Sequence, residues 1–496
     1  MADGAGPSRC GSDPPREAAG RHRPRGPTRA THRQVAVSRA EQLHLLTVAA
    51  AGRRIHDGSL TPTSYVEALI EQVRRLDPVL RCTIALAAEA ALAAAHLAES
   101  EIRRGGWKGP LHGIPIGIKD CIATEGLRTS ANSRVLGDWV PAQDAPAVAA
   151  LRAAGAIVFA KLNLNEFAWS IPSEDDLHAP PRNPWSLDHY AMGSSSGSAV
   201  AVASGLCPAA LGTDAGGSVR QPASNCGVVG LKPTHRLVDA SGAFAAPSIC
   251  EVGPITRSVE DAALLLGALA GGSYAENLGR PPKRARIGVP SRHIDLAQAD
   301  PQIGSAFAES IRVLRQLGME IVEVEIEGLA DAAAADFIVL NAEAFAAHET
   351  KLRTRMADYG PSARLYHTQG AFLSAADYIA ALRTGDMVRA RIDGTLAGVD
   401  ALATPVVPFL TAEAARAGKA QPHTGGGAIF TAPFNLTGHP ALVVPGGMSL
   451  EGIPIGLQLV GRAGGEAELL QLGHAYEQAT PWHAMHPPLD AAAALG

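Results

Sequence analysis

A segment of small residues between apolar runs, residues 193–227, is the feature that most constrains how this chain folds. The segment contains seven glycines and seven serines. Such a composition on its own is typical of a flexible linker. Here, however, the small residues are interrupted by Ala199–Ala203 and Leu206–Leu211 and are followed by Val228–Leu231, all of which favour burial. Glycines between buried runs indicate backbone packed closely around a site, so we predict that this segment belongs to the functional centre.

Helical and strand patterns alternate from Thr61 onward, which is typical of a layered α/β fold. A helix is expected to open at Thr61 and to stop before Pro78, and an Ala-rich helix is expected over about 84–104. We also predict helices over 258–270, 301–317, 331–357, 375–397 and 466–479, and strands over 114–119, 157–160, 209–211, 286–290, 320–327, 401–404, 441–444 and 453–461.

Composition excludes several classes of protein. Hydrophobic residues make up 46% of the chain and charged residues 18%, whereas a disordered chain combines low hydrophobicity with high net charge. The net charge of -5 argues against a nucleic-acid partner, and no apolar run reaches the roughly 20 residues that span a bilayer. Six scattered cysteines without a CxxC pair indicate neither a zinc knuckle nor a disulfide framework. We therefore expect a reduced, cytoplasmic protein with no membrane partner.

The first 36 residues differ from the rest of the chain. They hold seven arginines with several prolines and glycines, and they show no apolar periodicity. They also lack the apolar stretch of a secretory signal. We expect a disordered tail over 1–36, or an upstream start codon, followed by a single domain over 37–490.

Two generic motifs are candidates within the small-residue segment. A phosphate-binding loop requires GxxxxGK followed by Ser or Thr, and no such string is present. Residues 193–197 match the GxSxG nucleophile elbow, centred on Ser195. An elbow follows a hydrophobic strand, however, and the preceding residues PWSLDHYAM make a poor one. The GxSxG match is therefore the weaker hypothesis.

A third interpretation places the chemistry at residues 213–218, TDAGGS, directly after the apolar strand 209–211. Consecutive small residues allow several backbone N–H groups to point into one concavity and to bind an oxyanion. Ser218 at the end of this nest could attack the same carbonyl if a base takes its proton. Lys119 is the candidate base, because it ends the apolar strand IPIGIK, where burial would lower its pKa toward neutrality.

The same motifs resemble those of the amidase signature family. The resemblance rests on GIPIGIKD (113–120), PPRNPW (180–185), GSSSGSAVAVASG (193–205), LGTDAGGSVRQPASNCGVVGLKPT (211–234), GPITRSVEDAALLL (253–266) and NLTGHPALVVPGG (435–447). Weaker similarity extends from about residue 60 to 480. The resemblance implies an amidase signature fold, in which helices cover both faces of a large, mixed, twisted β-sheet.

The resemblance also implies a Ser–cis-Ser–Lys triad that needs no metal or cofactor. By motif position Ser218 is the nucleophile, Ser194 the bridging serine after a cis peptide bond, and Lys119 the base. The implied oxyanion hole consists of the backbone N–H groups of Ala215, Gly216, Gly217 and Ser218. Supporting roles fall to Ser195, Asp214 and Arg220.

The substrate pocket is less well indicated. Phe167, Trp169 and Ile171 lie in a segment that borders the cleft in similar proteins, and Met192 stands where the pattern commonly has glycine. Ordinary core packing explains the first three about as well, whereas Met192 could narrow or line the acyl pocket. The region 331–430 is expected to cover the cleft, and its aromatic residues are Phe337, Phe345, Tyr359, Phe372, Tyr378, Phe409 and Phe430.

The resemblance, with these aromatic residues, favours an amidase that hydrolyses a small apolar or aryl amide and acts as a monomer or homodimer. A carbamate or ester hydrolase of the same family is an alternative. The glutamine-hydrolysing A subunit of an amidotransferase is less favoured, because its recognition string Ser-Asn-Leu-Ala-Arg-Tyr-Asp-Gly is replaced here by IVLNAEAF (338–345). An α/β-hydrolase esterase using Ser195, or a catalytically silent binding protein, would belong to another class.

Overall fold

The computed structural model describes residues 43–244, 246–280, 284–294, 299–410 and 425–489. The chain divides into two compact units, Met1–Gln42 and Leu43–Gly496. The first unit, and with it the tail expected over 1–36, lies outside the described residues. All of the described residues belong to the second unit.

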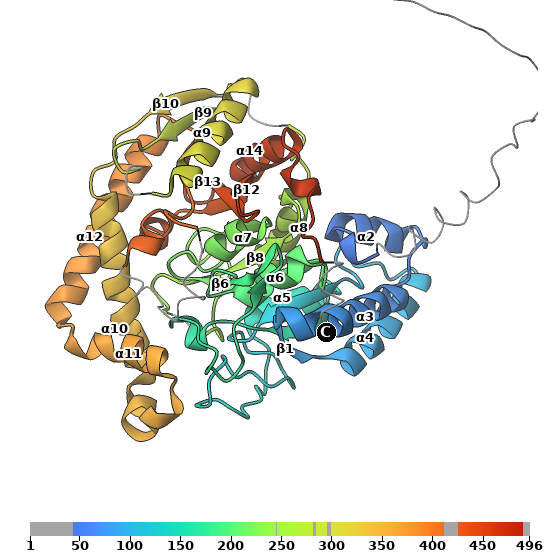
Figure 1. The fold of residues 1–496 in the computed structure, drawn as a ribbon. Helices are drawn as coiled ribbons and strands as arrows, with labels where there is room; N and C mark the ends of the chain where they lie inside the picture. Colours follow the sequence, from blue (N-terminus) through green and yellow to red (C-terminus); the bar gives the residue numbers. More distant parts are fainter. Residues whose placement is uncertain (1–42, 245, 281–283, 295–298, 411–424, 490–496) are drawn as a thin grey trace, which may run out of the picture. The chain divides into compact units, whose positions relative to one another are not determined.

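An 11-stranded sheet forms the centre of this unit (Figure 1). Its strand order is β1-β3-β2-β6-β8-β7-β12-β13-β11-β9-β10. The strands are β1 (Thr83–Leu86), β2 (Pro115–Lys119), β3 (Ile157–Leu162), β6 (Ala209–Asp214), β7 (Val229–Lys232), β8 (Glu251–Thr256), β9 (Arg286–Val289), β10 (Glu320–Glu323), β11 (Ala401–Pro405), β12 (Ala441–Met448) and β13 (Pro454–Val460). A separate two-stranded ribbon joins β4 (Arg182–Asn183) to β5 (Ser186–Tyr190).

The pairing within the sheet is mixed, and one part of it positions the site. Strand β2 runs parallel to β3 on one side and to β6 on the other, whereas β6 runs antiparallel to β8. In the β2–β6 pair, Ile118 lies opposite Leu211. Because parallel strands end at the same edge of a sheet, Lys119 at the end of β2 lies beside the residues that close β6.

Helices cover both faces of the sheet, as side-chain direction along β12 shows. Leu442 packs against Gly473 of α14 (Glu466–Gln478). The next residue, Val443, points with Gly456 toward Ser224 of α7 (Arg220–Cys226). Successive strand residues face opposite sides, so α14 and α7 lie on different faces. The expected class, an α/β fold with a large mixed sheet covered on both faces, is therefore confirmed.

The remaining helices extend these two layers. They are α2 (Val48–His56), α3 (Pro62–Leu80), α4 (Ala88–Arg103), α5 (Pro146–Ala153), α6 (Ser196–Ala203), α8 (Val259–Ala270), α9 (Pro301–Gln316), α10 (Leu329–Arg355), α11 (Pro361–Gln369), α12 (Ala375–Leu396) and α13 (Pro433–Leu436). Figure 1 shows the long helices α10 and α12 side by side at one end of the sheet, with α11 beyond them.

Two local predictions are wrong. Helix α3 does not stop before Pro78 but continues to Leu80. Its end is held by the Asp77 carboxylate, which accepts hydrogen bonds from the N–H groups of Cys82 and Thr83. The Ala-rich helix expected over about 84–104 begins only at Ala88, because Thr83–Leu86 pairs with β3 as the edge strand β1. Tertiary pairing outweighs the helical propensity of the alanines there.

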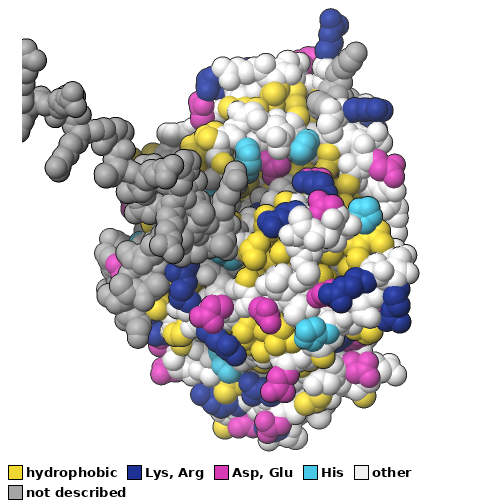
Figure 2. Space-filling view, turned by 90° about the vertical axis from the view of Figure 1, so that its right-hand side faces the viewer, with side chains coloured by type: hydrophobic (Ala, Val, Ile, Leu, Met, Phe, Trp, Pro, Cys, Tyr) yellow, Lys and Arg dark blue, Asp and Glu magenta, His cyan; other side chains and the backbone are white. Residues whose placement is uncertain are grey.

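The distribution of charge can be followed on one face of the molecule. On the face drawn in Figure 2, basic and acidic side chains are interspersed, and neither sign gathers into a continuous patch. In the described part of the chain, every helix is too short or too polar to cross a bilayer.

Candidate active site

Three separate segments converge at the carboxyl edge of β2 and β6. Lys119 is the last residue of β2, Ser194 lies just before α6, and the nest of residues 213–218 follows from β6 into α7. The parallel pairing of β2 with β6 brings the first and third segments together. Helix α6 contacts both strands and so carries the second segment to the same place.

The Lys119 side chain is completely buried at the centre of this site. Its Nζ donates to Ser194 Oγ at 2.7 Å and to Thr213 Oγ1 at 2.7 Å. Burial lowers the pKa of Lys119 from its ordinary value of 10.5, and the neighbouring groups Cys121, Cys250 and Asp214 oppose that shift without cancelling it. A lysine with a lowered pKa can lose its proton and then serve as a base.

Ser194 and Ser218 are brought close through their backbones. The peptide bond between Gly193 and Ser194 is cis. The N–H of Ser195 donates to the carbonyl of Ser218 at 3.1 Å, which ties the two serine segments together. Ser194 is buried, whereas Ser218 is partly exposed. Within the described residues no hydrogen bond joins the two hydroxyl groups; such contacts are often long before substrate binds.

Ser195 does not occupy the position of an elbow nucleophile. Its hydroxyl is buried, donates to the carbonyl of Thr213 at 3.2 Å and accepts from the N–H of Thr213 at 3.3 Å. The strand before it, β5, pairs only with β4 and stands outside the main sheet. The esterase hypothesis based on GxSxG is therefore wrong. Ser195 fastens the segment before α6 to β6.

The nest presents backbone N–H groups, but one of them is already used. The N–H of Gly217 donates to Asp214 Oδ1 at 2.7 Å. None of the described residues accepts a hydrogen bond from the N–H of Ala215, Gly216 or Ser218. Of the four groups expected to form an oxyanion hole, these three lack an acceptor in the described ranges, whereas the N–H of Gly217 shapes the loop.

Gly217 cannot carry a side chain in this conformation. Its φ is +126°, and a Cβ built on it would lie 2.4 Å from Thr431 Oγ1 and 2.8 Å from Gln221 Nε2. The same threonine hydroxyl donates to the carbonyl of Gly216 at 2.6 Å. Thr431 therefore holds the nest at Gly216, as Asp214 holds it at Gly217.

A buried ion pair between Arg220 and Asp214 supports the nest. Arg220 Nη2 lies 2.9 Å from Asp214 Oδ1, and both side chains are fully buried. Burial alone would raise the pKa of Asp214, but the guanidinium of Arg220, together with Lys232 and Asn435, outweighs burial and holds that pKa well below its ordinary value. Asn435 donates to the Asp214 carboxylate at 3.0 Å and to its carbonyl at 2.8 Å. Asp214 is therefore an anion whose bonds fix the loop.

Sequence comparison agrees with this geometry. A profile of the family described as Amidase matches residues 64–470. The chain belongs to the amidase family. The A subunit of the glutamyl-tRNA(Gln) amidotransferase from Roseiflexus castenholzii is 38% identical to this amidase-family chain, covering 90% of it and 98% of the relative.

Solved structures of amidases share the fold of this family member. A crystal structure described as an amidase superposes with a TM-score of 0.79 at 33% identity, covering 87% of this chain and 99% of its own. The native peptide amidase from Stenotrophomonas maltophilia superposes with a TM-score of 0.76 at 31% identity, covering 89% and 98%.

The four expected pocket residues are divided between two places in this amidase-family fold. Trp169 packs against Phe337 of α10, with ring centroids 5.4 Å apart, and its Nε1 donates to Asn341. Trp169, Phe337 and Ala215 of the nest all pack against one apolar cluster. Phe167 instead belongs to a buried group with Tyr359.

The other two pocket candidates are held by backbone bonds. The N–H of Ile171 donates to Ser362 of α11 at 2.6 Å. Met192 is buried two residues before Ser194, and its N–H donates to Asn225. Of the aromatic residues in region 331–430, Phe372 is 88% exposed and Phe430 is buried against His293, so the seven do not form one wall.

Sequence reasoning missed three residues that hold the site. Thr213 shares the Lys119 amine, Thr431 holds Gly216, and Asn435 holds Asp214. Thr213 and Asn435 lie inside the family motifs, and this position could have identified them as candidate site residues. Thr431 lies just outside them, and only its position in space identifies it.

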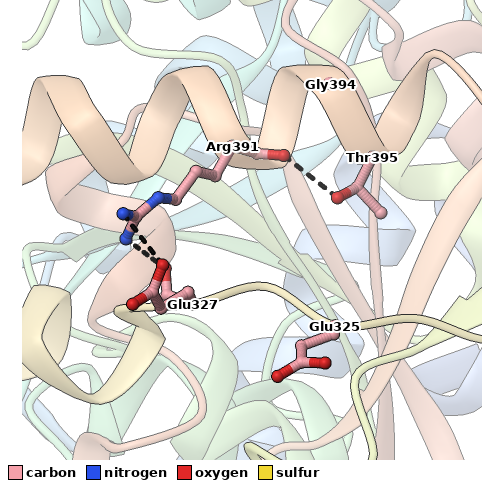
Figure 3. A pocket seen from close by; sticks show the side chains of 5 residues that line it. All are labelled: Glu325, Glu327, Arg391, Gly394 and Thr395. Carbon is pink, nitrogen blue, oxygen red and sulfur yellow. Dashed lines mark hydrogen bonds and ion pairs between the residues drawn. The ribbon is translucent and has the colours of Figure 1, made fainter.

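Two further features bear on ligands. No cluster of three or more His, Cys, Asp or Glu side chains arranged for a metal ion occurs in the described ranges. A hollow of about 520 Å³ is lined by five residues, which Figure 3 labels: Glu325, Glu327, Arg391, Gly394 and Thr395. Arg391 pairs there with Glu327 at 3.0 Å. The hollow contains none of the residues at the carboxyl edge of β2 and β6, so it is not the candidate active site.

Proposed function

We propose that this protein is an amidase that hydrolyses a small apolar or aryl amide through an acyl-enzyme on Ser218. The observation that carries the proposal is the buried Lys119 amine, 2.7 Å from Ser194 Oγ and beside a nest of open backbone N–H groups. A buried lysine without a carboxylate hydrogen-bonded to it is costly unless it is neutral, and a neutral amine is a base.

The first step transfers a proton away from the nucleophile. Ser218 Oγ attacks the substrate carbonyl carbon while its proton passes to Ser194 Oγ, and Ser194 passes its own proton to neutral Lys119. The carbonyl oxygen becomes an oxyanion, which accepts hydrogen bonds from the N–H groups of the nest. Donors fixed before the reaction stabilise this charge without reorganising.

The second step releases the amine. Lys119 returns a proton through Ser194 to the leaving nitrogen, the C–N bond breaks, and the acyl group stays on Ser218. Water then attacks the ester carbonyl, and the same relay accepts its proton and restores the Ser218 hydroxyl. Each step conserves protons among three side chains of the chain itself.

An aromatic wall next to the nest supports the substrate class. Trp169 and Phe337 pack on the same apolar cluster as Ala215 of the nest, and Phe337 directly follows Asp336, whose Oδ2 lies 3.5 Å from a Cβ built on Gly216. A carbamate or an ester would place its carbonyl in the same position, and these substrates remain the alternative within this class.

A panel of p-nitroanilides, primary amides, carbamates and p-nitrophenyl esters tests the proposal with the purified full chain. We expect wild-type protein to release p-nitroaniline from aryl-acyl anilides, and Ser218→Ala to release none. Wild-type hydrolysis of carbamates alone would shift the substrate class to carbamates. Inactivity on all four classes would overturn the proposal.

A second candidate is a glutamine-hydrolysing subunit, because relatives 38% identical over most of this chain are amidotransferase subunits. The residues that replace the glutamine-recognition string have other partners here. Asn341 accepts from Trp169, and Glu343 accepts from Tyr378 and from the N–H of Ser248. Ammonia release from L-glutamine, measured beside the amide panel, decides between the two candidates.

We further propose that the protein acts in the cytoplasm on a small molecule, as a monomer or homodimer. Five cysteines, Cys82, Cys121, Cys207, Cys226 and Cys250, are free and buried, which fits a reducing compartment. Light scattering on the purified chain tests the oligomeric state. An activity that appears only when a second, different chain is added would favour the amidotransferase candidate.

A further inference from the structure

Helix α10 buries one acidic residue, Asp336, where the helical pattern calls for an apolar one. The buried face of this helix includes Leu329, Ala332, Val339 and Leu340, at the i, i+3, i+4 spacing of a core stripe. Asp336 lies on the same stripe and is fully buried. A valine or leucine would satisfy that packing position without a polar group.

The carboxyl of Asp336 has no hydrogen-bond partner among the residues that the structure describes. Neither of its oxygens has a hydrogen-bond donor among the described residues. The nearby Arg220 has no donor left, because its five N–H groups are directed to Asp214, Asn435, Gln458 and the carbonyl of Thr431. Lys232, the other nearby cation, donates to the carbonyl of Pro233.

An unpartnered buried carboxyl is unfavourable for folding. Leaving a buried polar group without a hydrogen bond costs stability, and burial accordingly raises the pKa of Asp336 well above its ordinary value. The described part of the chain supplies no donor to these oxygens. A water molecule or a ligand could supply one.

The position of Asp336 shows which ligand can reach it. A Cβ built on Gly216, in the middle of the nest, would have one neighbour within 4 Å, Asp336 Oδ2 at 3.5 Å. The next residue on α10, Phe337, packs against Trp169. The carboxyl therefore lies against the nest that would hold the substrate carbonyl, and beside the aromatic wall.

We propose that Asp336 is a specificity-determining residue that accepts a hydrogen bond from an N–H group of the substrate. This inference rests on the proposed function, since it assumes a carbonyl held at the nest. The N–H group has two possible sources, the nitrogen of the scissile amide or an amino group on the acyl part. Either N–H group can donate a hydrogen bond to a carboxyl oxygen of Asp336. An aliphatic or aryl ester without nitrogen has no such N–H group.

Four matched substrates separate the sources: an acyl anilide, the corresponding phenyl ester, and the same pair with an amino group on the acyl chain. Asp336→Val removes the acceptor, and Asp336→Asn keeps its size. Asp331→Asn is the matched control, because Asp331 is an exposed acid on the same helix. For each substrate the measured quantity is the ratio of kcat/KM in the variant to that in wild-type protein.

We expect Asp336→Val to lose about ten- to one-hundred-fold more kcat/KM on N–H-bearing substrates than on the plain phenyl ester. A loss on both anilides assigns the contact to the scissile nitrogen, and a loss on both aminoacyl substrates assigns it to the acyl amine. Asp336→Asn should retain part of the discrimination. The melting temperature of Asp336→Val should not fall, because the variant replaces an unpartnered polar group by an apolar one.

Equal losses on all four substrates would overturn the inference and leave Asp336 as a support of the nest. So would unchanged ratios on all four. If wild-type protein were inactive on every substrate and phenylmethylsulfonyl fluoride failed to label Ser218, the proposed function itself would fail, which is a different result from either of these.

Discussion

Lys119 Nζ and Ser194 Oγ lie 2.7 Å apart although 75 residues separate them in the sequence. No carboxylate hydrogen-bonds to this amine; its other hydrogen-bond partners in the described residues are the hydroxyl and carbonyl of Thr213. Such surroundings suit a neutral amine better than an ammonium ion, because hydroxyl groups can both donate and accept. This relationship leads to the first two predictions.

Lys119→Ala should lower kcat/KM for anilide hydrolysis by about 10²- to 10⁴-fold, since it removes the group that takes the serine proton. Ester hydrolysis should fall less, because its leaving group needs less protonation. Initial-rate assays on a matched anilide and ester measure the two losses of kcat/KM. Lys108→Ala, at an exposed lysine, is the control. Full anilidase activity in Lys119→Ala would remove lysine from the mechanism.

Activity should rise with pH. The reaction requires neutral Lys119, and burial lowers its pKa below 10.5, so the neutral fraction grows as pH increases through the lowered value. The acidic limb of the kcat/KM profile should therefore have its midpoint below 10.5. The substrates should carry no group that titrates in this range, so that the observed midpoint can be assigned to the enzyme. A profile that is flat from acid to neutral pH would contradict a lysine base.

Ser218, rather than Ser195, should carry the covalent adduct. A fluorophosphonate or phenylmethylsulfonyl fluoride should modify the peptide with Ser218, because its side chain is partly exposed beside open N–H groups, whereas the Ser195 hydroxyl is buried on Thr213. Ser195→Ala should still acylate, though more slowly if the loop is loosened. Peptide mass mapping gives the site directly. An adduct on the 193–197 peptide with Ser218 unmodified would overturn the assignment.

Gly217→Ala should destabilise the nest. The added Cβ would clash with Thr431 Oγ1 at 2.4 Å, and alanine rarely adopts a φ of +126°. We expect the free energy of unfolding to fall by roughly 1–3 kcal/mol. We also expect kcat to fall by a larger factor than in a glycine variant that leaves the nest intact. Chemical denaturation and anilide turnover measure the two effects.

Gly452→Ala is the matched control for that variant, because Gly452 also has a positive φ, +77°, but open space around it. It should lose some stability and keep its turnover. If Gly217→Ala lost no more stability or turnover than Gly452→Ala, the close contact between Gly217 and Thr431 would not be needed to shape the nest.

Local patterns in the sequence determined a large part of this protein. Apolar runs that end in a polar residue predicted β2 and β6, and the strings around Lys119, Ser194 and Ser218 indicated the family. Those features depend on neighbouring residues, which is why they can be read along the chain. The wrong prediction at Thr83–Leu86 falls where pairing with the distant strand β3 outweighs local propensity, whereas at Pro78 the helix runs on to Leu80 and its end is held by bonds of the nearby Asp77 carboxylate.

Only the tertiary structure decided which polar groups meet. The parallel register of β2 with β6 places Lys119 beside Thr213. The packing of α10 near the nest places Asp336 against Gly216. Arg220 uses all of its donors on other partners, so Asp336 is buried without a hydrogen-bond partner in the described part of the chain. Strand register and helix docking depend on the fit of surfaces far apart in the sequence, and hydrogen-bond partners follow from that fit rather than from the spacing of residues along the chain.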